Sequence, residues 1–253
     1  MKNWKAVLLL AGCLMFSGFT LNSALAQSPN ASVYVVHGIP GHDVSESLDS
    51  ALPVDVQATV GSTSICLLKG FKFGDIAGPF TIPAASYNFT ISLANTVDPC
   101  SNPALLTANG VAFAEGENAS LVAYLNAEGA PGVKKFDNDV SPIPAGQSRV
   151  IVQHTANAPA VDIHVARYTF LTPLRPVTIP NVRNGEQAQA DLPSEQAWNY
   201  PTTQVTLTPA GDKSPVIGPY FFQLEPHDVY LIYAVGSLST GSFTLISKVI
   251  RGV

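Results

Sequence analysis

The sequence is poor in charge. Only 12% of its 253 residues are Asp, Glu, Lys or Arg, against about 25% in an average soluble protein. Acidic residues outnumber basic ones by 18 to 13, so we expect neither a nucleic acid nor an anionic membrane surface as a partner. Low charge together with 20 prolines and 19 glycines favours an exported all-β protein rich in turns.

The sequence also lacks recognisable enzyme motifs. It contains no G-x-S-x-G elbow, no H-E-x-x-H helix, no phosphate-binding glycine loop and no dinucleotide fingerprint. We therefore predict a non-catalytic protein without a cofactor. A secreted hydrolase is a weaker alternative, because a catalytic triad can assemble from residues far apart in the sequence.

The N-terminus has the pattern of an export signal. Lys2 and Lys5 precede an apolar stretch that ends near Phe19, and an A-x-A site follows at residues 24–26. This pattern predicts a secretory signal peptide over residues 1–26. Without its two lysines, the mature chain has 11 basic and 18 acidic residues and a net charge of −7.

Two further inferences concern the membrane. Leu10-Ala11-Gly12-Cys13 is similar to a bacterial lipobox, so a lipid anchor at Cys13 is an alternative to cleavage after Ala26. No later segment reaches the roughly 18 apolar residues of a membrane span, so the mature chain is expected to have none. We predict export to the periplasm, the cell surface or the medium.

Cysteine is scarce, and two residues remain after the signal peptide is removed. An even count in an oxidising compartment predicts a disulfide between Cys66 and Cys100. Closing a loop of about 34 residues stabilises the fold by roughly 3–4 kcal/mol in the chain-entropy model. The alternative is a pair of buried thiols.

The mature chain contains an internal sequence repeat. Residues 33–37 and 53–56, VYVVH and PVDV, repeat the order of residues 150–154 and 160–163, VIVQH and AVDI. Later matches keep this order: Gly74-Asp75 with Gly185-Glu186, Thr81–Pro83 with Asp191–Pro193, Phe89–Leu93 with Gln204–Leu207, and Ser120–Tyr124 with Tyr230–Ala234. The offsets of 107–117 residues indicate a tandem duplication of a unit of common domain size.

The boundary between the copies is predicted at a proline-containing segment. We assign residues 27–140 to repeat 1, 141–146 to a short stiff linker and 147–253 to repeat 2. Asp137-Asn138-Asp139 resembles the start of a calcium loop but lacks the later Gly and Glu that such a loop requires. A structural connector is therefore predicted.

Each copy has the pattern of a β-sandwich. Short β-rich runs alternate with Gly, Pro, Asn and Asp at about 8–12-residue spacing. Val161–Val165 alternates apolar and polar residues, as a strand with one buried face does, and no apolar pattern of helical period is sustained. We predict an all-β protein of two tandem Ig-like or transthyretin-like β-sandwich domains.

A family resemblance rests on the motif of repeat 2. Residues 154–163, HTANAPAVDI, resemble the H-x-S-P-D-A-P-x-V-D-V hallmark of bacterial exported repeat domains of unknown function. Residues 82–87, IPAASY, are similar to that family's L-P-A-G-x-Y turn. In the motif of residues 154–163, Ala156 and Asn157 replace the family's usual Pro-Asp. The resemblance implies β-sandwiches at the cell surface or in the periplasm, and no reaction.

The candidate binding residues are polar groups shared, in part, by the two copies: His37, Asp55, His154, Asp162 and His164. Imidazole and carboxylate groups bind zinc and copper, so a metal or carbohydrate site in repeat 2 is one hypothesis. Repeat 1 has Gln57 in the place of His164, so the shared histidine and aspartate are predicted first of all to bond backbone groups at a turn.

Two other groups have a functional and a structural interpretation. His42, Asp43, Glu46 and Asp49 lie in a long loop of repeat 1, either as a cation site or as a solvated insertion. Aromatic residues of repeat 2 form either a binding platform or part of a core, and the core is favoured: Tyr220, Phe221, Phe222, Tyr230 and Tyr233. Trp198 is the better candidate for an exposed contact.

From these observations we predict an exported, non-catalytic cell-envelope or surface protein that acts as a binding or structural module. Its expected partner is a protein or glycan at the cell surface.

Overall fold

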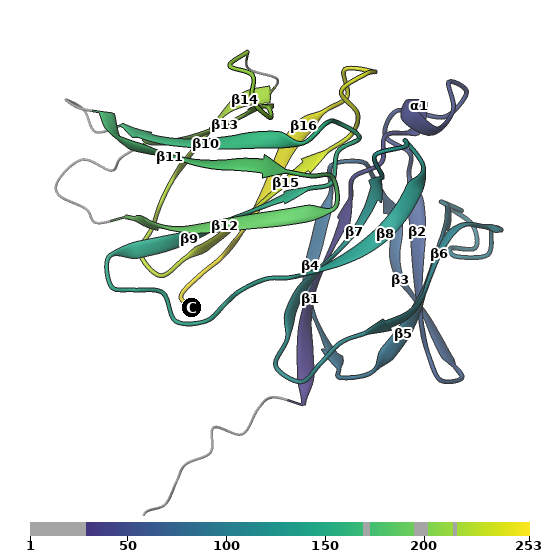
Figure 1. Cartoon of the computed structure of the whole chain (residues 1–253). Helices are drawn as coiled ribbons and strands as arrows, with labels where there is room; N and C mark the ends of the chain where they lie inside the picture. Colours follow the sequence, from purple (N-terminus) through teal and green to yellow (C-terminus); the bar gives the residue numbers. More distant parts are fainter. Residues whose placement is uncertain (1–28, 169–172, 195–201, 215–216) are drawn as a thin grey trace, which may run out of the picture.

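The structure is a computed structural model that describes residues 29–168, 173–194, 202–214 and 217–253. The predicted signal peptide, Cys13 and Trp198 lie outside these residues. The described residues form one short helix and sixteen strands (Figure 1): β1 (Asn30–His37), α1 (Gly41–Val44), β2 (Val54–Val60), β3 (Thr63–Phe71), β4 (Ile76–Pro83), β5 (Ser86–Leu93), β6 (Ala104–Ala112), β7 (Asn118–Leu125), β8 (Pro131–Asp137), β9 (Gln147–His154), β10 (Val161–Tyr168), β11 (Pro173–Val182), β12 (Glu186–Pro193), β13 (Thr202–Pro209), β14 (Ile217–Gln223), β15 (Val229–Val235) and β16 (Thr244–Ile250).

The strands build two sandwiches of the same topology. In the first sandwich, sheet β4-β1-β7-β8 faces sheet β3-β2-β5-β6. In the second, sheet β12-β9-β15-β16 faces sheet β11-β10-β13-β14. Each strand of the first sandwich thus has its counterpart eight strands later, down to the parallel pairs β1–β7 and β9–β15. The prediction of tandem all-β sandwiches is confirmed.

The register corrects one detail of the repeat alignment. The sequence alignment of the two copies makes Ala123 the counterpart of Tyr233. In the structure, His37 pairs with Ala123 and His154 pairs with Ala234. Ala123 therefore corresponds to Ala234, one residue later, because an apolar run such as Tyr230–Ala234 has too little alternation to fix its own register.

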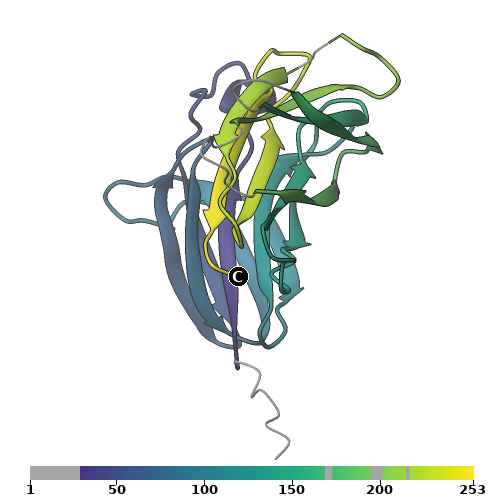
Figure 2. The same ribbon diagram turned by 90° about the vertical axis from the view of Figure 1, so that its left-hand side faces the viewer.

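The second sandwich packs sideways against the first through a third core. Besides the core inside each sandwich, a cluster forms between the outer faces of sheets β4-β1-β7-β8 and β12-β9-β15-β16. Figures 1 and 2 show these sheets side by side. The cluster includes Tyr34, Val36, Val122, Phe136, Ile143, Ile151, Val229, Leu231, Tyr233 and Val235. Strand β15 is consequently buried at every position, because it lies between two cores.

Most of the clustered aromatic residues of the second sandwich are core residues, as predicted. Phe222 and Tyr230 stack with ring centroids 5.2 Å apart, and Tyr220 packs against the same core. Tyr233 belongs to the core between the sandwiches, where its hydroxyl lies 2.8 Å from Ser120 Oγ. Phe221 is the exception, with 57% of its surface exposed.

The segment between the sandwiches is tied down by a buried arginine. Arg149 on β9 donates to both carboxylate oxygens of Asp191, at 2.7 and 2.9 Å, and its Nη1 lies 2.8 Å from Asp139 Oδ1. Nη1 also donates to the carbonyl and the hydroxyl of Ser141. Asp139 thus serves as an ion-pair partner that joins the connector to the second sandwich.

Within the part of the chain that the structure describes, no helix is long and apolar enough to cross a membrane.

Candidate functional site

The two shared histidines have the same role in both sandwiches. His37 and His154 each end the first strand of their sandwich, and both are buried. His37 Nε2 lies 2.9 Å from the carbonyl oxygen of Leu52, and His154 Nε2 lies 3.0 Å from that of Pro159. A carbonyl can only accept a hydrogen bond, so Nε2 carries the proton and donates it. Each histidine thereby fixes the loop that leads into the next strand.

Both histidines are held in the neutral form. Burial lowers the pKa of His37 and of His154 below the ordinary value, because a charged imidazolium would lose its hydration. In His37 the unprotonated Nδ1 accepts a hydrogen bond from the Ile39 amide at 3.3 Å. In His154, Nδ1 has no partner among the described residues. Neutral donors bonded to their own backbone suit a structural role.

The shared aspartates also bond to backbone amides. Asp55 on β2 is buried, and its carboxylate accepts hydrogen bonds from the amides of Gly70, Asn95 and Cys100, each at 2.9 Å. Burial alone would raise the pKa of Asp55, but the three amide donors outweigh it and hold that pKa below its usual value. Asp55 thus ties the end of β3 to the segment after β5.

Asp162 repeats this arrangement in the second sandwich with fewer bonds. Its carboxylate accepts from the amides of Asn181, at 2.8 Å, and Gly211, at 3.0 Å. These bonds lower the pKa of Asp162. The predicted turn-fixing role of the histidine and the aspartate therefore agrees with their bonds in both copies.

The three residues of the hypothetical metal group come from two sheets: Asp162 and His164 lie on β10, whereas His154 ends β9 in the facing sheet. His164 contacts two threonine hydroxyls, Nδ1 to Thr178 at 3.1 Å and Nε2 to Thr208 at 2.9 Å. Among the described residues, no three His, Cys, Asp or Glu side chains come close enough to hold a metal ion. The structure does not join His154, Asp162 and His164 into one site.

Some carboxylates of the repeat 1 loop accept hydrogen bonds within the chain, and others are exposed to solvent. Asp43 on α1 accepts a hydrogen bond from Ser242 of the second sandwich, and Asp49 accepts one from the Ala51 amide. His42 and Glu46 are exposed. The insertion therefore contacts the second sandwich through Asp43.

The side chain of Asn157 has a structural role. The amide group of Asn157 donates to the carbonyl oxygens of Asn126 and Ala127 in the first sandwich, at 2.8 and 2.9 Å. Its side-chain oxygen accepts from Ser237. Asn157 thus joins the motif loop to the first sandwich, which an aspartate could not do because a carboxylate has no N–H to donate.

The disulfide predicted from the cysteine count is present. Cys66 on β3 is bonded to Cys100, which follows β5. It lies in the same region as Asp55, whose carboxylate accepts from the Cys100 amide. The bridge and the aspartate therefore secure the same loop.

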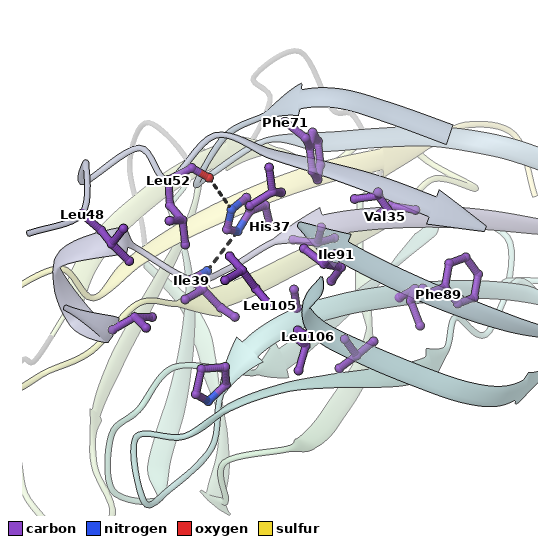
Figure 3. Close-up of a pocket in the computed structure, with 18 residues that line it drawn as sticks. Val35, His37, Ile39, Leu48, Leu52, Phe71, Phe89, Ile91, Leu105 and Leu106 are labelled. Carbon is purple, nitrogen blue, oxygen red and sulfur yellow. Dashed lines mark hydrogen bonds between the residues drawn. The ribbon is translucent and has the colours of Figure 1, made fainter. Parts of the chain in front are cut away.

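The first sandwich also contains a cavity that sequence reasoning did not find. Its volume is about 140 Å³, and it lies between the two sheets at the end covered by α1. Figure 3 shows apolar side chains surrounding it, with His37 bonded to Leu52 and Ile39 at one side. Exposed apolar residues stand at its mouth: Val44, Leu105 and Pro131.

The cavity offers a guest almost no polar contacts. Apolar cavities of such size stay dry, because water finds no hydrogen-bonding partners in them. The only titratable side chain in the wall, His37, already uses both ring nitrogens. The space is therefore suited to an uncharged, apolar guest.

The corresponding position in the second sandwich carries an aromatic ring. Val133 pairs with Ala123, and Leu245 pairs with Ala234, so Pro131 at the cavity corresponds to Phe243. Phe243 is buried, and its ring is nearly parallel to that of His154, with centroids 6.2 Å apart and an interplanar angle of 4°. His37 has the ring of Phe71 beside it at 6.0 Å, tilted by 34°, but the first sandwich has no ring at the Pro131 position, where the cavity opens.

The sequence held signals for this difference. The loop from Gly38 to Leu52 of the first copy adds Val44 and Leu48 to the cavity wall, and the short loop of the second copy has no counterpart. The exchange of Pro131 for Phe243 could have been found only with the correct register of β15.

Comparison with known protein families gives a match for the first part of the chain. Residues 31–164, more than half of the chain, match a family described as "Domain of unknown function (DUF4397)". The chain belongs to this family. The DUF4397 match begins in β1, includes the whole first sandwich and ends in β10 at His164. Recognition of a domain of unknown function is thus confirmed at the level of the family, while any role of the individual motif residues stays a prediction.

Among curated proteins, no relative of this chain is found. Solved structures give distant likenesses. The Bacillus anthracis TIE protein is 9% identical with a TM-score of 0.23, and the match covers 87% of this chain and 34% of that one. The chain thus spans about a third of the length of the TIE protein. A putative cell adhesion protein from Bacteroides uniformis is 8% identical with a TM-score of 0.25, over 87% of this chain and 97% of the other.

Proposed function

We propose that the mature protein is an exported, non-catalytic module of the cell envelope or surface, which binds or positions a partner there. One observation carries the proposal: each of the five candidate binding residues is hydrogen-bonded within its own chain. His37, His154, Asp55 and Asp162 serve loops, and His164 serves two threonines. A catalytic group must instead reach a substrate.

The docking of the sandwiches supports a positioning role. Between them lies an apolar core together with buried polar contacts, in which Asn138 Oδ1 accepts hydrogen bonds from Ser120 at 3.0 Å and from Gln153 at 3.1 Å. Asn157 and Asp43 add contacts at the periphery. A buried apolar face with bonded polar groups opposes independent motion of two domains. The module would present its loops in one fixed arrangement.

The disulfide supports export. Disulfides persist in oxidising compartments, and Cys66–Cys100 joins segments that the Asp55 carboxylate also holds. Export can be tested by expressing the full chain in a bacterium and determining the mass of the recovered protein. We expect an N-terminus at Gln27 in the periplasm or medium. Full-length protein in the cytoplasm would overturn the proposal, and a lipidated N-terminal Cys13 would replace cleavage after Ala26.

The non-catalytic, metal-free assignment is tested by thermal unfolding of the mature protein in EDTA and with added calcium, zinc or copper. A metal at a hundred times its dissociation constant would add about 2.7 kcal/mol, a shift of several degrees. We expect no shift for any metal, and a lower midpoint for His154→Ala because a loop bond is lost. A metal-dependent shift that disappears in His154→Ala would establish the metal-binding alternative.

A further inference from the structure

We infer that the cavity of the first sandwich is a binding site for a small, uncharged aromatic molecule whose ring is the size of benzene. This inference deepens the proposed function and rests on it, since it names what such an exported module binds. Its premises are the volume of the cavity, the chemistry of its wall and the occupant of the equivalent space in the second sandwich.

The size of the cavity fits one aromatic ring. Its volume is about 140 Å³, and an engineered apolar cavity of about 150 Å³ lined by Leu, Ile and Phe binds benzene. Aliphatic side chains from both sheets provide the wall, together with Phe71 and Phe89 (Figure 3). The site is therefore large enough for one aromatic ring.

The chemistry of the wall selects against charge. His37 donates to Leu52 and accepts from Ile39, so it has no hydrogen-bonding capacity left for a guest. A carboxylate or ammonium group placed there would lose its hydration without compensation. The exposed residues Val44, Leu105 and Pro131 at the mouth continue the apolar surface outward.

The second sandwich indicates an aromatic shape. At the position equivalent to Pro131 it carries Phe243, which stacks on the equivalent histidine at 6.2 Å. The His37 ring lies in the wall of the open cavity. A free aromatic ring would occupy the first sandwich as the Phe243 ring occupies the second. The repeated unit thus contains its own example of the bound state.

The experiment uses toluene as the probe, with benzoate and n-hexane as charged and linear competitors. Binding to the mature protein is measured by saturation-transfer NMR and by the rise in melting temperature. We expect toluene to bind and to raise the midpoint by several degrees at saturating concentration, with benzoate and n-hexane at least tenfold weaker. Absence of toluene binding, or tighter binding of either competitor, would overturn the inference.

Two variants at one position locate the site. Pro131→Phe is expected to fill the cavity, weaken toluene binding at least tenfold and raise the melting temperature of the free protein. Pro131→Ala, the matched control, should keep the affinity within about threefold. If the folded Pro131→Phe protein binds toluene as the wild type does, the guest lies elsewhere and the inference fails.

A second measurement does not depend on any variant. Intermolecular NOEs from the toluene ring should reach the methyl groups of Val35 and Leu121 in the cavity wall; NOEs to other methyl groups only would contradict the site. N-acetylphenylalanine amide serves as a model of an aromatic side chain in a peptide. If it binds more tightly than toluene, the assignment of the site to small molecules is overturned. Export and the metal titration can succeed while toluene fails, so failure here is distinct from failure of the proposed function.

Discussion

The two sandwiches share a topology, a histidine and an aspartate, yet they use the space beside the histidine differently. The second sandwich closes it with Phe243, and the first covers a cavity with α1 and the loop that follows. The residues that the copies share serve the fold in both, whereas the cavity depends on residues that differ. Two copies of one unit can therefore share their turns and still differ in the space beside the histidine.

The largest effect is expected from opening the second sandwich. Phe243→Ala should reduce the free energy of unfolding by about 4 kcal/mol, because a buried ring is removed and the core relaxes only partly. Pro131→Ala at the equivalent, exposed position should change it by less than about 0.5 kcal/mol. Urea unfolding measures both. Equal losses at the two positions would show that the sandwiches do not differ as described.

The second-largest effect is expected from the disulfide, which only the first sandwich contains among the described residues. Replacing both Cys66 and Cys100 with alanine should destabilise the first sandwich by about 3 kcal/mol, because the unfolded chain regains the freedom of a loop of 34 residues. Hydrogen exchange of backbone amides would locate the loss. Protection should fall in β2, β3 and β5 more than in β10, β11 and β13. A uniform loss throughout the chain would mean that the two sandwiches unfold as one unit.

The aspartates provide a matched pair. Asp55→Asn should cost about 2 kcal/mol or more, since a buried carboxylate loses its charge opposite three amide donors. Asp162→Asn, with two donors and greater exposure, should cost less. Denaturant midpoints of the two variants decide the order. A larger loss for Asp162→Asn would reverse our ranking of the two turns.

The histidines predict a smaller, pH-dependent effect. Their pKa values are lower in the folded protein than the ordinary 6.5 of the unfolded chain, so the unfolded state takes up protons first as the pH falls. Stability should therefore decline below about pH 6.5 until the folded pKa values are reached. The double variant His37→Gln/His154→Gln should show a flatter melting temperature between pH 7.5 and 5. An unchanged slope in that variant would assign the decline to other groups.

Local patterns were sufficient to predict much of this molecule. Strand alternation, turn residues and the cysteine count gave the sandwiches and the Cys66–Cys100 bridge, because each depends on neighbouring residues or on compartment. The prediction that the repeated His and Asp bond turns rested on the copy with Gln57, and their hydrogen bonds to backbone groups agree with it.

The docking and the cavity depend on register, which the sequence fixes poorly where strands are continuously apolar. The run Val229–Val235 did contain a signal, because a strand without polar alternation is typically buried on both faces, as β15 is. The cavity required more: a correct pairing of β15 with β9, and the path of the insertion across the end of the first sandwich.

The parallel pairing of β1 with β7 also has a mechanical consequence. Tension applied to the chain ahead of β1 acts along the strand, while its partners from Ser32–Asn118 to His37–Ala123 are held side by side. The hydrogen bonds between β1 and β7 are then all loaded in shear at the same time, so they cannot break one after another. A protein held at an envelope by its N-terminal side would resist pulling at its first strand, and in the second sandwich β9 and β15 repeat that clamp.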